Sequence, residues 1–148
     1  LMAPSDRAKL LHDAIKMRAD IAAHKPPKGL LDVKLCEGGL VDLEFAVHSL
    51  QLLEKEGFDP HLPAALASLC ARGFLPATAL SAYQFLTRLL VTVRLMAPDL
   101  SEPDPATRGL IARACGAGNW ADLLEQLASN RQSVSTIWSA VRARQTGD

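Results

Sequence analysis

The stretch Asp32-Val33-Lys34-Leu35-Cys36-Glu37-Gly38-Gly39-Leu40-Val41-Asp42-Leu43-Glu44-Phe45 decides the fold of this chain, because a short extended approach, a paired-glycine turn and an apolar helix meet in it. The two glycines allow backbone conformations that other residues disfavour, and they let another group come close to the main chain. After them, apolar residues recur at three- and four-residue steps, which predicts a helix over about residues 40–56 that ends at Gly57. A second apolar set points in another direction, so we expect this helix to be buried on more than one side.

The same reading predicts five more helices, over about residues 5–24, 64–71, 76–97 and 106–115, and from 119 to beyond 141. Proline and glycine clusters separate them. The charged residues of the first helix, Arg18 among them, are expected on its solvent face. Residues 30–35 read as a short, partly β-like segment, and the polar tail 145–148 is expected to fray. The predicted fold class is an all-α bundle of about six helices, with residues 1–148 forming a single helical domain.

Composition and charge narrow the class of protein. The 148 residues are 49% hydrophobic and 22% charged, as in an ordinary globular domain. Sixteen basic residues balance sixteen acidic ones, so there is no electrostatic case for nucleic acid as a partner. No apolar run is long enough to span a membrane, and no secretion signal opens the sequence. Three widely spaced cysteines indicate reduced thiols and a cytoplasmic location. The initial leucine hints at a piece of a longer chain.

Two acidic residues, Asp42 and Glu44, fall in the first turns of the central helix. A spacing of two residues turns them about 200° apart on a helix, so both cannot face one small ligand. Asp42 can complement the helix dipole and cap the helix start, or it can help to line a phosphate and metal site. Glu44 lies among apolar neighbours and needs a partner, for which Lys34, Arg88 and Arg94 are candidates.

The remaining polar residues of the stretch also have two interpretations. Lys34 can be a cation directed at a phosphate or an ordinary exposed side chain. Gly38 and Gly39 can form a close-approach site for a ligand or a tight turn into the helix; they match no established nucleotide-binding loop. No histidine and cysteine spacing indicates a metal site, and no nucleophile motif is present. Trp120 and Trp138 fall on the apolar stripe of the last helix and are predicted in the core. The residues themselves predict neither a catalytic nor a metal-binding group within the chain.

The motif Lys34-x3-Gly38-Gly39-Leu40-x-Asp42-Leu43-Glu44-Phe45 resembles the Lys…Gly-Gly-Ile/Leu-x-Asp-Ile-Glu-Phe signature of glutamine synthetase adenylyltransferases. These bifunctional nucleotidyltransferases attach AMP to a tyrosine of glutamine synthetase and remove it again. The similarity continues through the helix after the motif, in residues 47–53, and returns in the Ala-Tyr-x-Phe-Leu segment at 82–86. Some members have smaller residues where this chain has Cys36 and Glu37.

The resemblance implies an architecture in which a nucleotidyltransferase domain, holding Mg²⁺ and ATP through Gly-Ser and Asp-x-Asp elements, precedes a helical domain. This chain has no such elements, so it resembles the helical domain alone, and its segment 26–34 resembles the C-terminal, adenylylating half. The resemblance carries over Lys34, Gly38, Gly39, Asp42 and Glu44 as the motif that faces the nucleotide cleft. It also implies the nucleotidyltransferase domain, glutamine synthetase and a PII-type signalling protein as partners.

Two other interpretations stay open at this point. The chain can be a free-standing helical interaction module with no nucleotide role, its glycine turn purely structural. It can also be the equivalent domain of a uridylyl-transferring signal enzyme, although the motif matches that class less well. On the first reading we expect the isolated chain to fold, to bind neither Mg²⁺ nor ATP tightly and to have no transferase activity.

Overall fold

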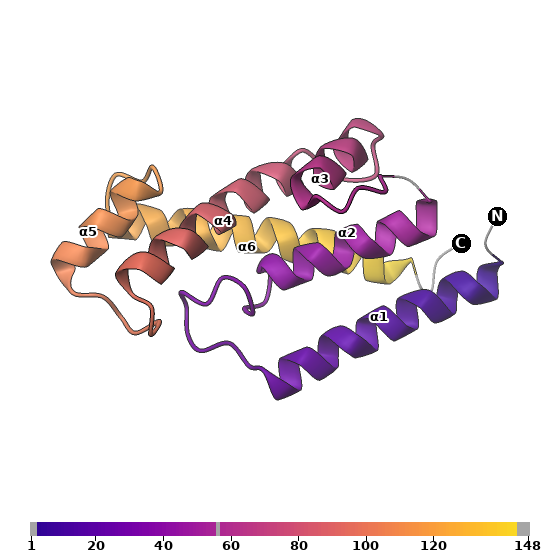
Figure 1. Cartoon of the computed structure of the whole chain (residues 1–148), viewed down its shortest axis with the longest axis horizontal. Helices are drawn as coiled ribbons and strands as arrows, with labels where there is room; N and C mark the ends of the chain where they lie inside the picture. Colours follow the sequence, from indigo (N-terminus) through magenta and orange to yellow (C-terminus); the bar gives the residue numbers. More distant parts are fainter. Residues whose placement is uncertain (1–2, 56, 145–148) are drawn as a thin grey trace.

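The structure, a computed structural model, describes residues 3–55 and 57–144 and contains six α-helices and no strand within those ranges (Figure 1). The prediction of an all-α bundle is therefore confirmed. None of these helices combines the length and the apolar character that crossing a membrane requires. The helices are α1 Pro4–His24, α2 Leu40–Glu54, α3 Leu62–Ala71, α4 Thr78–Met96, α5 Pro105–Ala114 and α6 Trp120–Ala143.

The core lies where α2, α4 and α6 meet. The long helix α6 packs along both α2 and α4, while α3 and α5 cover the sides of this trio. Leu43, Leu86 and Leu127 are each fully buried there, one from each of the three helices. The helix α1 lies at the outer edge of the bundle beside α2, and this is its only extensive helix packing within the described residues (Figure 1). Burial of α2 on several faces follows from its two apolar sets, as the sequence predicts.

An ion-pair cluster fastens the outer helix at its start. Glu54, at the end of α2, pairs with Arg7 of α1 at 3.7 Å and also with Arg144, next to the end of α6. Arg7 additionally donates to the carbonyl oxygen of Leu53 at 3.1 Å. These contacts join the start of α1 to the ends of α2 and α6, so one end of α1 is fixed to the bundle.

Two expectations about local structure need correction, and a third is not tested. The helix α2 ends at Glu54, and its C-cap is Lys55 in the left-handed conformation instead of Gly57; Glu56 lies outside the described residues. Residues 30–35 form turns and no β-like segment. The reason is Asp32, whose carboxylate accepts from the backbone N–H groups of Lys28 at 3.0 Å and Leu35 at 3.3 Å. Such side-chain bonds compete with extended structure. The tail 145–148 also lies outside the described residues.

The helix α6 begins at a side-chain cap. The Asn119 side chain caps this helix by accepting the N–H of Asp122 at 2.8 Å. Asn119→Ala removes that acceptor, and we expect it to lower the free energy of unfolding by about 1 kcal/mol. Urea denaturation followed by circular dichroism measures the change, and Asn119→Ser, which keeps a capping oxygen, should recover most of it. An unchanged midpoint in the alanine variant would show that the cap does not contribute.

Candidate functional site

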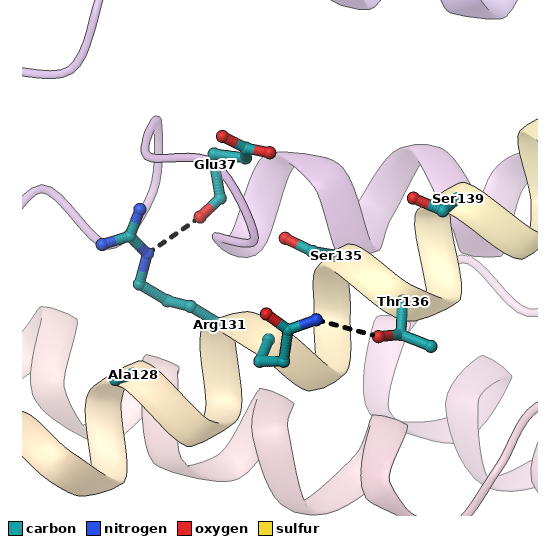
Figure 2. Close-up of a pocket in the computed structure, with 7 residues that line it drawn as sticks. Glu37, Ala128, Arg131, Ser135, Thr136 and Ser139 are labelled. Carbon is teal, nitrogen blue, oxygen red and sulfur yellow. Dashed lines mark hydrogen bonds between the residues drawn. The ribbon is translucent and has the colours of Figure 1, made fainter.

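The twin glycines press the loop before α2 against α6. Gly38 has a φ of +73°, and a Cβ atom built on it would lie 2.7 Å from Ser135 Oγ and closer still to the carbonyl oxygen of Arg131. The Arg131 side chain reaches back and donates to the Glu37 carbonyl oxygen at 2.8 Å, as Figure 2 shows. A Cβ on Gly39 would meet the loop itself, 2.9 Å from the Cys36 carbonyl oxygen. The close approach that these glycines permit is thus made within the chain.

Asp42 holds the same loop through its contacts with Gly38 and with Arg18 of α1. It is only 4% exposed, and its Oδ2 accepts the N–H of Gly38 at 2.7 Å. Its Oδ1 pairs with Nε of Arg18 from α1, and Arg18 also donates to the Leu35 carbonyl oxygen at 3.4 Å. The start of α2 has no side-chain cap, so Asp42 does not cap the helix itself and binds instead the loop that precedes it. Asp42 also connects α1, the loop and α2.

The expectation that Arg18 lies on the solvent face of α1 is wrong. Arg18 is 9% exposed and, with Leu11, one of the two buried residues of that helix. A spacing of seven residues puts the two on one face, toward α2, so the sequence carried a signal that the charge obscured. Arg131 and Ser135 were also missed, and no local pattern distinguishes them from the other polar residues of α6.

Lys34 and Glu44 lie on a different surface, a groove between α1 and α2. One section of it, of about 510 Å³, is lined by Lys34 and Val41 and by α1 residues that include Met17. The next section, of about 410 Å³, is lined by Met17 again and by Glu44 and Phe45. Because Met17 lines both, the two sections adjoin, and we refer to them together as the α1–α2 groove. Lys34 is exposed and Glu44 is half-buried.

Glu44 does not find the partner expected for it. Within residues 3–55 and 57–144, it has no hydrogen bond or ion pair with Lys34, Arg88, Arg94 or any other residue. Its position explains this, because the groove leaves one side of the carboxylate in water. The neighbouring His48 pairs through Nδ1 with Gln51 Oε1 at 2.9 Å. Asp42 and Glu44 point to different surroundings, as their spacing predicts.

No metal centre is found among the described residues. No group of three acidic, histidine or cysteine side chains gathers among them in a way that could hold a metal ion. The Cys36 thiol is buried, and desolvation raises its pKa, which favours the neutral, unreactive form. Trp138 is buried against Phe45, with ring centroids 6.0 Å apart, whereas Trp120 is half-buried under Arg108. The site therefore consists of a cation, Lys34, and a carboxylate, Glu44, along an open groove. The packed residues Gly38, Gly39 and Asp42 hold the loop that carries Lys34.

Comparisons with known proteins identify the family of the chain. Residues 15–141 match a family model described as GlnD PII-uridylyltransferase. A bifunctional glutamine synthetase adenylyltransferase/adenylyl-removing enzyme of Rhizobium meliloti is 35% identical over 89% of this chain. Enzymes of the same name from Caulobacter vibrioides and Agrobacterium fabrum are each 33% identical, over 95% and 80% of the chain. The chain spans only 13–15% of the length of these relatives. No solved structure matches it significantly.

The matched family model covers most of the chain, so this bundle is a helical unit of the nucleotidyltransferase class that the model describes. Within that class, the curated relatives place it more narrowly. The chain belongs to the glutamine synthetase adenylyltransferase family, and the resemblance carried by the Lys34-to-Phe45 motif is confirmed.

Proposed function

We propose that this chain is the helical accessory domain of a cytoplasmic enzyme that transfers AMP from ATP to a tyrosine of glutamine synthetase. Family membership supports the enzyme. The resemblance of segment 26–34 to the C-terminal half supports a place beside the domain that adds AMP. The relatives are about seven times as long as the chain, which leaves ample room for a separate nucleotidyltransferase domain.

One observation carries the proposed role of the motif: Lys34 and Glu44 lie on an open groove while Gly38, Gly39 and Asp42 are packed inside. The three buried residues hold the loop before α2 in place, and the loop in turn positions the Lys34 ammonium group. Placed at the edge of a neighbouring nucleotide site, this ammonium group neutralises phosphate charge. Nucleotidyl transfer depends mainly on positioning and electrostatics, so a domain that binds no metal can still contribute to the rate.

The described residues do not fit a magnesium site, because no three acidic, histidine or cysteine side chains gather among them. We propose that the nucleotidyltransferase domain holds both Mg²⁺ and ATP. Glutamine synthetase is then the protein substrate, and a PII-type signalling protein is a further proposed partner of the whole enzyme.

The test of this function is Lys34→Ala in the full-length protein. Because Lys34 is exposed, the fold should be unchanged, whereas AMP transfer to glutamine synthetase should fall roughly tenfold to a hundredfold. Lys16→Ala is the matched control, because it removes an exposed lysine of α1 that does not line the groove. Transfer at the wild-type rate in both Lys34→Ala and Glu44→Ala, with intact circular dichroism, would favour the interaction module without a nucleotide role.

A further inference from the structure

The outer helix α1 is covered on only part of its apolar surface. It is 21 residues long, yet Leu11 and Arg18 are its only buried residues. Most of the stability of a helix in a protein comes from packing of its apolar face, and within the described residues α1 packs extensively against α2 alone. Met17 accordingly remains 58% exposed. The side of α1 that borders the groove is therefore available to another element.

The Glu44 section of the α1–α2 groove has two apolar walls between which a third helix can pack. Leu10, Ala14 and Met17 line one wall at helical spacing, and Phe45 and Leu52 line the other. Leu52 is 50% exposed, so both walls present apolar surface to solvent. Two adjacent helices leave a groove into which the side-chain ridge of a third helix packs. Such an occupant would insert apolar residues at positions i, i+3 or i+4, and i+7.

Two carboxylates, Asp13 and Glu44, line this section together with His48, and no lysine or arginine does. Covering the groove would take the half-buried, unpartnered Glu44 carboxylate out of water. This desolvation is costly unless the occupant brings a cation to it. The groove therefore favours a helix that carries lysine or arginine opposite Glu44 and disfavours an acidic one.

We propose that the Glu44 section of the α1–α2 groove binds a basic amphipathic helix that belongs to another part of the same polypeptide. This inference rests on the proposed function, in which a longer enzyme contains the chain. The section spans about two turns of each wall, too little surface for stable association between free proteins. A helix in the same polypeptide needs far less intrinsic affinity, because tethering holds it at an effective concentration of about 1 mM.

The experiment is hydrogen exchange of the α1 amides around residues 10–17, measured by mass spectrometry in the full-length protein. In the wild type these amides should exchange at least roughly tenfold more slowly than in the 148-residue chain alone. Glu44→Lys should abolish this protection, and the isosteric Glu44→Gln should weaken it. Glu125→Lys is the control, because it makes the same charge change at an exposed site of α6 outside the groove.

Several outcomes would overturn the inference. Equal exchange in the full-length protein and the isolated chain would mean that nothing covers the groove. If protection survives Glu44→Lys, the occupant is not a basic helix. If protection of the isolated chain increases with its concentration, the occupant of the groove is a second copy of the chain. Exchange requires no catalysis, so its result is independent of the Lys34→Ala transfer assay, and a failure of this inference leaves the proposed function standing.

Discussion

Gly38→Ala is expected to lower the free energy of unfolding by about 3 kcal/mol or more. Two effects add. The φ of +73° costs a residue with a side chain about 1–2 kcal/mol, and forcing a methyl group into a filled space costs a further 1–3 kcal/mol. Ser135 Oγ can rotate away from the new Cβ. The Arg131 carbonyl oxygen cannot, because it belongs to the backbone of α6, so the loop has to move off the helix.

Two other glycines separate these effects. Gly73 has a φ of +79° but no atom within 4 Å of a built Cβ, so Gly73→Ala measures the conformational cost alone, about 1 kcal/mol. Gly39 has an ordinary φ of −93° with a crowded Cβ position, so Gly39→Ala measures the crowding alone, about 2 kcal/mol. Urea denaturation of the three variants gives the comparison. A Gly38→Ala cost no larger than that of Gly73→Ala would show that the loop does not press on α6.

The helices could be predicted from the sequence because their signals are local. Apolar periodicity, proline and glycine lie within the segment that they organise, and the six helices follow from them. The prediction of a β-like segment at residues 30–35 was wrong, and the cause is a local side-chain interaction that no sequence pattern indicates. Asp32 satisfies the backbone N–H groups of Lys28 and Leu35, and a carboxylate that will do so looks in the sequence like any other aspartate.

The candidate site depends on contacts between distant parts of the chain, and these could be predicted only in part. The motif residues were identified, but their division between a buried corner and an open groove follows from how α1 and α6 pack. Gly38 meets a helix more than ninety residues further along the chain, at Arg131. The partner of Asp42 is Arg18, 24 residues before it. A periodic pattern indicates which face of a helix is apolar, but not which other helix covers that face.

Breaking the buried ion pair is the second large effect we expect. Arg18 and Asp42 have side chains that are 10% and 6% exposed. Arg18→Met leaves the Asp42 carboxylate with only the Gly38 N–H, and Asp42→Asn leaves a buried guanidinium group without a counter-charge. Each should lower the free energy of unfolding by about 3 kcal/mol. Glu102→Gln, which breaks an exposed pair with Arg108, should change it by less than about 1 kcal/mol.

The double variant decides whether the two residues act together. If the pair is one interaction, Arg18→Met/Asp42→Asn should cost less than the sum of the single changes by about 1–3 kcal/mol, because the second substitution removes a charge that the first left unpaired. Strict additivity would mean that each residue contributes separately, Asp42 through its bond to Gly38.

Arg18→Met should loosen α1 before it affects the rest of the bundle. At the Arg18 end, α1 is held by this pair and by the bond to the Leu35 carbonyl oxygen, whereas Arg7 holds the other end. Arg18→Met should therefore release the Lys34 end of the groove first. In hydrogen exchange, the amides of α1 near Arg18 should lose protection while the core amides of α4 and α6 keep theirs. Equal loss in all three helices would mean that the pair supports the whole core, and that α1 does not loosen separately.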